Sequence, residues 1–365
     1  MKLLIAAGGT GGHIIPAIAL GEALRQHHPG APIRYLCGER EIELRLYADN
    51  GIEPIVLPAR QLGSGLAAHA IGLAAALANT ARAAALIRRE HFDTVIGMGG
   101  YVSGPAVAAA VMLRRASAIH EANSIPGKTN RLLAPFVDLC AINFPMTAGM
   151  LRSRKILRTG LPMRGDIDKG ARDDAMKHFA LDPRKRTLLV MGGSQGARYL
   201  YRTIMQTLPA LDIHAHADVQ VLWSTGRTNH EELTEELAKT DLEYLSVRLE
   251  PFIERMDLAL AAADTALARA GAGAIAEMLA CGVYALYIPL PSAIYDHQTQ
   301  NAREVAAAGA GEAIPENSFT VRRAAVAIAS LLSRTELGWR ITNPPELDSR
   351  NSAKTLADAL CALSA

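Results

Sequence analysis

Residues 2–17 read KLLIAAGGTGGHIIPA. The apolar run at residues 2–7 predicts a buried strand, and the pattern of residues 14–26 predicts a helix. Between them lie four glycines and a threonine. Glycines in this position let backbone N–H groups approach a phosphate closely, and the N-terminal end of the next helix adds positive potential. The segment therefore predicts the first unit of a parallel α/β domain with an anion-binding loop.

The same pattern restarts in the second half of the chain, where residues 186–198 read RTLLVMGGSQGAR. Between the halves, residues 157–168 carry the turn signals of a linker. Such alternation predicts α/β architecture with two Rossmann-like parallel-sheet domains, whose ligands lie at the carboxyl ends of the strands, in an interdomain cleft. Further strand-like runs lie at residues 33–37, 94–98, 219–223, 246–249, 265–268 and 284–288.

Composition limits the class of protein. A length of 365 residues suggests two domains. Lys and Arg number 38 against 36 Asp and Glu, a net charge of +2, which gives no support for a nucleic-acid partner. The four cysteines form no CxxC pair, so neither a zinc knuckle nor a redox pair is indicated, and scattered thiols fit a reducing cytosol.

The sequence also predicts no membrane-spanning segment. The N-terminus lacks the long apolar core of a signal peptide. No run approaches about 18 uninterrupted apolar residues, the length that a spanning helix needs. The longest apolar-looking region, residues 62–87, is rich in alanine and interrupted by His69, Asn79 and Arg82. We expect it to form an amphipathic or buried helix.

His13 follows the first glycines directly. There it can reach a substrate hydroxyl as a general base, or it can make a structural hydrogen bond at the start of a helix; the loop alone leaves both open. The loop is neither a Walker loop nor a GxGxxG motif. Two more clusters follow in this half, GMGGYVSGP at residues 97–105 and HEANSIPGKTNR at residues 120–131.

The second of these clusters is expected after a strand end, with its polar side chains bound to hydroxyls or a pyrophosphate. His120 and Glu121 could both be metal ligands, but neighbours on a strand point to opposite faces, so no metal site is predicted. In the second half, Glu277 within ARAGAGAIAE can accept both ribose hydroxyls, or can be an acid favoured by the helix dipole. Residues 295–302, YDHQTQNA, are typical of a sugar-binding edge.

These six motifs, in this order and spanning residues 8–302, resemble the MurG family of UDP-N-acetylglucosamine transferases, which make lipid II from lipid I. The resemblance implies a GT-B fold, inversion at the anomeric carbon, no cofactor and no nucleotide-bound catalytic metal. It also implies a lipid-acceptor domain at residues 1–162, completed by a helix at residues 346–365, and a UDP-sugar donor domain at residues 163–345. The implied partners are UDP-N-acetylglucosamine, polyprenyl-linked lipid I and the cytoplasmic face of the membrane.

Carried over position by position, the resemblance also implies the site. Ile253 would contact the uracil through its backbone, Glu277 the ribose, and Arg164 the nucleotide from the linker. The implied catalytic residues are His13, Glu121 and Asn130. The implied acceptor-binding residues are Gly9, Gly12, Gly99, Gly100, Tyr101 and Ser103. The implied donor-binding residues are Thr10, Gly11, Gly12, Asn123, Arg164, Ser194, Gln195, Gly196, Ile253, Arg269, Ala272, Glu277, Gln298 and Thr299.

Three departures from the family pattern bear on donor affinity and membrane docking. Ala270 stands where the family commonly has serine, Leu161 where it has asparagine, and residues 65–87 contain no aromatic residue. The expected membrane contact is residues 65–89 with their arginines, joined by Arg114 and Arg115. Alternative functions are another GT-B enzyme of UDP-sugars, such as a glycolipid synthase or a UDP-N-acetylglucosamine 2-epimerase, and a non-catalytic cell-wall scaffold.

Overall fold

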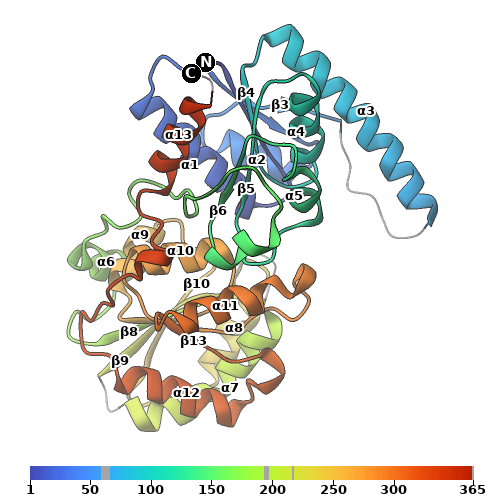
Figure 1. Cartoon of the computed structure of the whole chain (residues 1–365). Helices are drawn as coiled ribbons and strands as arrows, with labels where there is room; N and C mark the ends of the chain where they lie inside the picture. Colours follow the sequence, from blue (N-terminus) through green and yellow to red (C-terminus); the bar gives the residue numbers. More distant parts are fainter. Residues whose placement is uncertain (59–65, 193–196, 216–217, 364–365) are drawn as a thin grey trace. The chain divides into compact units, whose positions relative to one another are not determined.

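The computed structural model describes residues 1–58, 66–192, 197–215 and 218–363. The chain forms two compact units, each with its own parallel sheet (Figure 1). Unit 1 comprises Met1–Arg164 and Ser349–Ala365, and unit 2 comprises Gly165–Asp348. The fold class predicted from the sequence, α/β with two Rossmann-like parallel-sheet domains, is confirmed.

Unit 1 contains a seven-stranded parallel sheet in the order β3-β2-β1-β4-β5-β6-β7. Its interior strand β1 is buried on both faces, as expected where helices cover both sides of a parallel sheet. The order reverses between β1 and β4, so the loops after these two strands flank a topological switch point. The strands are β1 Leu3–Ala7, β2 Ile33–Cys37, β3 Ile55–Val56, β4 Thr94–Gly99, β5 Ala116–Glu121, β6 Leu139–Ile142 and β7 Ile156–Arg158.

Alternate residues of β1 enter different cores. Leu4 and Ala6 pack in one cluster with α4, whereas Leu3 and Ile5 pack in the other with α1 and α13. The C-terminal helix α13 thus completes the domain that the N-terminal strand begins (Figure 1). The helices of unit 1 are α1 Gly11–His27, α2 Glu41–Ala48, α3 Leu66–Glu90, α4 Ser103–Met112, α5 Lys128–Leu133, the 3₁₀ helix η1 Pro145–Met150, and α13 Ser352–Ala362.

Unit 2 repeats the plan with six parallel strands in the order β10-β9-β8-β11-β12-β13. Trp223 of β9 is fully buried in its main core. The strands are β8 Arg186–Met191, β9 Val219–Ser224, β10 Ser246–Glu250, β11 Thr265–Ala268, β12 Ala285–Tyr287 and β13 Gly311–Ala313. The helices are α6 Arg172–Phe179, α7 Arg198–Ala215, α8 His230–Ala238, α9 Met256–Ala262, α10 Ala272–Ala280, α11 His297–Ala307 and α12 Val321–Ser333, with 3₁₀ helices η2 Ile294–Asp296, η3 Glu316–Ser318 and η4 Pro345–Leu347.

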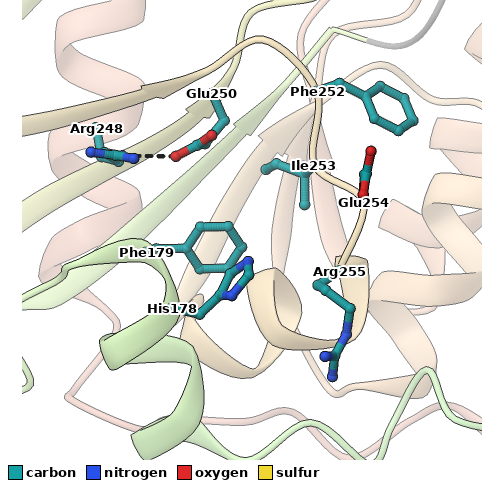
Figure 2. Close-up of a pocket in the computed structure, with 8 residues that line it drawn as sticks. All are labelled: His178, Phe179, Arg248, Glu250, Phe252, Ile253, Glu254 and Arg255. Carbon is teal, nitrogen blue, oxygen red and sulfur yellow. Dashed lines mark hydrogen bonds and ion pairs between the residues drawn. The ribbon is translucent and has the colours of Figure 1, made fainter.

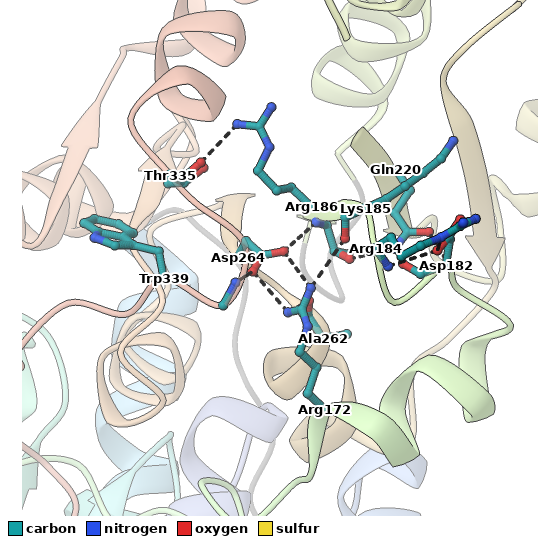
Figure 3. Close-up of polar contacts among 12 residues, drawn as sticks. Arg172, Asp182, Arg184, Lys185, Arg186, Gln220, Ala262, Asp264, Thr335 and Trp339 are labelled. Carbon is teal, nitrogen blue, oxygen red and sulfur yellow. Dashed lines mark hydrogen bonds and ion pairs between the residues drawn. The ribbon is translucent and has the colours of Figure 1, made fainter. Parts of the chain in front are cut away.

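A buried carboxylate joins the segments at the amino-terminal end of the two middle strands of this second sheet (Figure 3). Asp264 lies just before β11, and its two carboxylate oxygens accept hydrogen bonds from Nη1 and Nη2 of Arg172, each at 3.0 Å. It also accepts the backbone N–H groups of Thr187 at 2.7 Å and Gly338 at 2.6 Å. A buried charge is tolerated when it is paired and its lone pairs are used, as here. Asp264 therefore joins the start of α6, strand β8 and the segment after α12.

The cluster at residues 120–131 differs from its prediction in one respect. His120 and Glu121 do not follow a strand end but are the last two residues of β5. They make separate contacts, as expected for neighbours on a strand. No helix within the described ranges is both long enough and apolar enough to cross a bilayer.

Candidate active site

The two glycine loops of unit 1 pack directly against each other at the switch point between β1 and β4. The N–H of Gly8 donates to the carbonyl of Gly99 at 3.3 Å. A Cβ atom added to Gly100 would lie 2.2 Å from the carbonyl oxygen of Gly8, and Gly100 has a φ of +82°. Both the contact and the backbone angle require glycine. The loops therefore form one continuous surface.

His13 lies in the first turn of α1, and its Nδ1 is 3.1 Å from the carbonyl oxygen of Gly8. A carbonyl only accepts, so Nδ1 carries the hydrogen and the neutral ring has its lone pair on Nε2. A Cβ atom added to Gly99 would lie 2.4 Å from the imidazole Cδ2. The glycine loops thus hold both the tautomer and the position of His13.

Glu43 of α2 was not identified from the sequence, although it is central to this loop. Its carboxylate is fully buried. Oε1 accepts the N–H of Gly9 at 2.9 Å and the hydroxyl of Tyr101 at 2.7 Å, and Oε2 accepts the N–H of Gly38 at 2.7 Å. Burial, followed by the Glu43 carboxylate, raises the pKa of Tyr101. Two predicted acceptor-binding groups, Gly9 N–H and Tyr101 hydroxyl, therefore donate to Glu43.

Ser103 orders the second glycine loop. Its hydroxyl lies 2.7 Å from the carbonyl oxygen of Ala6 and 2.6 Å from that of Gly99, and it accepts the N–H of Gly99 at 3.0 Å. Only 4% of Ser103 is exposed, so its predicted contact with acceptor would be limited. Thr10 and Gly12, in contrast, are exposed beside the start of α1.

Glu121 and Asn130, two of the three predicted catalytic residues, are in direct contact. The Glu121 carboxylate accepts the N–H of Asn123 at 3.0 Å, the N–H of Gly127 at 2.9 Å and the Nδ2 of Asn130 at 2.8 Å. The carboxylate thus closes the loop from residue 121 to residue 130. With three donors bound, it is a weaker candidate for the general base than His13.

His120 faces away from this loop and is buried. Its Nε2 lies 2.9 Å from the carbonyl oxygen of Gly160, and burial lowers the pKa of His120 to about 4. Nδ1 has no hydrogen-bond partner within the described part of the chain. The side chain is therefore neutral and structural.

In unit 2, the segment that follows β10 lines a cavity of about 270 Å³ (Figure 2). Ile253 lies in its wall, 5% exposed, opposite the ring of Phe179 from α6. Arg248 and Glu250 at its edge form an ion pair at 2.7 Å. The lining combines the apolar side chains of Phe179, Phe252 and Ile253 with polar and charged side chains. The lining residues are His178, Phe179, Arg248, Glu250, Phe252, Ile253, Glu254 and Arg255.

The other predicted donor residues of unit 2 lie after β11 and β12. Ala272 begins α10, and Glu277 lies half-buried in its second turn. Gln298 and Thr299 lie in the first turn of α11, where Gln298 Oε1 accepts the N–H of Leu290 at 3.0 Å. Nearby, the buried Asn301 donates to the carbonyl of Ala270 at 3.1 Å.

Arg269 is more enclosed than expected for a sugar contact. Its side chain is buried, donates to the carbonyl of Ile288 at 3.0 Å and forms an ion pair with Glu316. Arg164, the last residue of the first segment of unit 1, is exposed. Ser194, Gln195 and Gly196 lie outside the described residues. Among the described residues, no three His, Cys, Asp or Glu side chains gather as a metal site would require.

Family models and named relatives both match this chain to one family of glycosyltransferases. Residues 3–142 match the glycosyltransferase family 28 N-terminal domain, and residues 187–358 match the C-terminal domain of the same family. A relative from Lactiplantibacillus plantarum, 35% identical with 92% of each chain covered, is named UDP-N-acetylglucosamine–N-acetylmuramyl-(pentapeptide) pyrophosphoryl-undecaprenol N-acetylglucosamine transferase.

Solved structures agree. The crystal structure of Acinetobacter baumannii MurG superposes with a TM-score of 0.77 at 29% identity, covering 99% of both chains. UDP-GlcNAc 2-epimerase from Neisseria meningitidis reaches 0.69 at 13% identity, which shows a shared fold alone. The predicted GT-B fold is thereby confirmed.

Proposed function

The chain belongs to the MurG family within glycosyltransferase family 28, and from this premise we propose how it acts in peptidoglycan synthesis. It transfers N-acetylglucosamine from UDP-N-acetylglucosamine to the muramyl 4-hydroxyl of lipid I and forms lipid II. Support comes from the named relatives, which match across nearly the whole chain. Unit 1 serves as the lipid-acceptor domain and unit 2 as the UDP-sugar donor domain.

The single observation on which the chemistry rests is the hydrogen bond from His13 Nδ1 to the carbonyl of Gly8. It leaves the lone pair on Nε2, so His13 can accept the proton of the 4-hydroxyl as general base. The hydroxyl oxygen forms a bond to the anomeric carbon while the bond from that carbon to the diphosphate breaks. UDP leaves, and one displacement inverts the anomeric centre.

The acceptor pyrophosphate is proposed to bind at the start of α1. The first N–H groups of a helix have no partner within the helix, and the helix dipole favours an anion there. In α1 these groups belong to Gly11 and Gly12, because the N–H of His13 already bonds to the carbonyl of Thr10 at 3.1 Å. The N–H of Gly9 is used by Glu43 and is not part of this proposal.

The donor is proposed to bind unit 2. The uracil occupies the cavity beside Phe179, with the backbone of Ile253 at its polar edge. Glu277 accepts hydrogen bonds from the ribose hydroxyls, and Ala272, Gln298 and Thr299 line the sugar. The proposed pyrophosphate contacts, Ser194, Gln195 and Gly196, come from the family resemblance.

The membrane face is proposed on α3, α4 and the region of α5, which are neighbours in unit 1 (Figure 1). Large apolar side chains are exposed there, namely Leu77, Met112, Leu132 and Phe136. Arg88, Arg89 and Arg114 are exposed on the same elements or at their ends and can meet anionic headgroups on the cytoplasmic face. Phe136 supplies the aromatic ring that residues 65–87 lack.

Turnover with UDP-N-acetylglucosamine and a short-chain lipid I analogue tests the function. We expect a β-linked disaccharide product, and His13→Ala should lower kcat by about 10²–10⁴ while UDP still binds. An α-linked product would exclude the single displacement. Conversion of UDP-N-acetylglucosamine without acceptor would identify an epimerase, and absence of any turnover would favour a scaffold. Normal turnover in His13→Ala with an inactive Glu121→Ala would assign the base to Glu121.

A further inference from the structure

One peptide unit, between Gly8 and Gly9, lies between two functional side chains. Its carbonyl oxygen is 3.1 Å from Nδ1 of His13, and its N–H donates to Oε1 of Glu43 at 2.9 Å. The buried carboxylate and the imidazole are therefore connected through opposite ends of a single amide. No other group intervenes in this chain of hydrogen bonds.

We propose that Glu43 is a positioning residue for His13 and acts through the Gly8–Gly9 peptide. This inference rests on the proposed role of His13 as general base. In hydrolases with a catalytic triad, a carboxylate bonded to Nδ1–H sets the tautomer of the histidine and stabilises the imidazolium as it forms. Here the carboxylate acts indirectly. It polarises the Gly8–Gly9 amide through the Gly9 N–H, which makes the Gly8 carbonyl a stronger acceptor of the hydrogen bond from Nδ1–H.

The Gly8–Gly9 peptide needs a partner that fixes its orientation, because glycines flank it on both sides. With glycine on both sides and a φ of +89° at Gly9, this peptide can rotate more readily than an ordinary one. A rotated peptide would turn the carbonyl oxygen toward the Glu43 carboxylate, where two acceptors would face each other. Glu43 therefore favours the one orientation in which the carbonyl meets His13.

Glu43 is itself fixed by its surroundings. Gly38 N–H and the Tyr101 hydroxyl donate to it, each at 2.7 Å, from the loops after β2 and β4. A Cβ atom added to Gly8 would lie 2.8 Å from Oε2, so the carboxylate fits closely against the peptide. On the outer side, Arg40 donates to the carbonyl of Gly9 at 3.0 Å. The carboxylate position is thus defined by three separate loops.

The first test measures the tautomer of His13, in the unaltered protein and in Glu43→Gln. The imidazole ¹⁵N shifts of His13 in the full-length protein distinguish a ring protonated at Nδ1 from one protonated at Nε2. We expect the Nδ1–H form, and in Glu43→Gln a mixture of the two forms. An Nε2–H ring in the unaltered protein would overturn the proposal regardless of whether any variant folds.

The second test is a double-mutant cycle. Glu43→Gln should lower kcat by about tenfold with little change in the KM for UDP-N-acetylglucosamine, since a charge-assisted hydrogen bond becomes a neutral one. In a His13→Ala background the same change should cost less than about twofold, because a residue that acts through His13 has nothing left to position. An equal loss in both backgrounds would overturn the proposal.

Tyr47→Phe is the matched control. Tyr47 lies on the same helix as Glu43, is fully buried, and donates to the carbonyl of Ala7 at 3.2 Å, one residue before the peptide. Removal of the Tyr47 hydroxyl should leave both the tautomer of His13 and kcat unchanged. If Tyr47→Phe changed the tautomer as Glu43→Gln does, a general loss of packing would explain the effect.

The proposed function and this inference can fail separately. An unaltered protein that transfers no sugar contradicts the proposed function, whereas the tautomer measurement still tests whether Glu43 acts on His13 through the Gly8–Gly9 peptide.

Discussion

Gly99 touches the imidazole of His13 so closely that no side chain fits there. Its φ is +120°, and an added Cβ atom would lie 2.4 Å from Cδ2 of the ring. Gly99→Ala should therefore displace His13 and lower the single-turnover rate by at least about tenfold, since a displacement near 1 Å costs about 10²-fold. UDP affinity, measured by calorimetry, should not change.

Gly51→Ala is the control for this prediction. Gly51 also has a positive φ, +66°, but nothing lies within 4 Å of an added Cβ atom. Alanine at position 51 would therefore have a positive φ but would make no contact comparable to that between position 99 and the His13 ring. Equal rate losses in Gly51→Ala and Gly99→Ala would mean that strain, rather than displacement of His13, lowers the rate.

A substitution at Glu277 tests the proposed donor site in unit 2. A hydrogen bond to a charged group contributes about 1.5–3 kcal/mol, so Glu277→Ala should weaken UDP binding by about one to two decades. Calorimetry measures this directly. Glu235→Ala, at an exposed position of α8, is the control. Unchanged UDP affinity in Glu277→Ala would remove Glu277 from the site.

Individual residues of the site could be predicted unevenly from the sequence. Motif residues such as His13 were proposed as site residues because a run of glycines at a strand–helix junction favours a ligand-binding loop. Glu43 was missed because it is one of several acids in a charged segment, residues 39–47, which read EREIELRLY. Nothing in this pattern separates a buried glutamate from an exposed one. Its burial depends on loops from residues 9, 38 and 101, which only the folded sheet brings together.

Strand β5 places a neutral histidine inside unit 1, which makes stability depend on pH. Burial lowers the pKa of His120 to about 4, below the ordinary value of about 6.5. The folded state therefore resists protonation. The contribution to stability is fully present above pH 6.5 and is lost as the pH falls from 6.5 toward 4, amounting to about 3 kcal/mol at about 1.4 kcal/mol per pKa unit.

Hydrogen exchange of the β5 amides between pH 7 and pH 4, corrected for the intrinsic rate, measures this loss. His120→Gln keeps a donor near the carbonyl of Gly160 but cannot be protonated, so its protection should fall less than that of the unaltered protein. His27→Gln, at an exposed position of α1, is the control. The same acid-induced loss in all three proteins would exclude His120 as its source.

Helices α3 to α5 give the prediction for membrane binding. Leu132 and Phe136 are 71% and 61% exposed. Replacing both by glutamate should reduce co-sedimentation with anionic vesicles, because it removes apolar area and adds repulsion. Activity on a soluble acceptor analogue should persist. Val326→Glu, at an equally exposed apolar position of α12 in unit 2, should sediment normally; if it is impaired as well, the membrane face is not confined to unit 1.

Several strands were predictable from their apolar runs. The apolar runs of β1, β2, β8 and β11 were located within about one residue. Of the helix predicted at residues 62–87, the part from residue 66 onward is observed within α3, and residues 62–65 lie outside the described residues. Strands β3, β7 and β13 contain two or three residues each, too few for a period-two pattern to appear. They exist because a neighbouring strand offers hydrogen bonds, which is a property of the sheet.

At the scale of the whole molecule, the chain ends in the unit where it began. The Ser349 hydroxyl accepts the N–H of Leu161 at 3.2 Å, and the Ser352 hydroxyl donates to its carbonyl at 2.5 Å. The side chain of Leu161 is buried, and its backbone makes both of these hydrogen bonds. Helix α13 then packs on α1, with Leu356 and Leu360 fully buried.

The stability of unit 1 should therefore depend on the last residues of the chain. Leu360→Ala is expected to destabilise unit 1 by about 2–5 kcal/mol, the usual cost of a buried leucine. Both tryptophans, Trp223 and Trp339, lie in unit 2, so tryptophan fluorescence follows unit 2 alone, while circular dichroism follows both units.

Leu360→Ala should lower the circular dichroism transition and leave the fluorescence transition in place. Leu331→Ala, in the core of unit 2, should shift the fluorescence transition instead. If Leu360→Ala lowers the fluorescence midpoint as far as Leu331→Ala does, the two units unfold as a single cooperative block. Separate transitions would mean that the C-terminal helix contributes its packing energy to unit 1, far along the sequence from strand β1, whose Leu3 and Ile5 share its core.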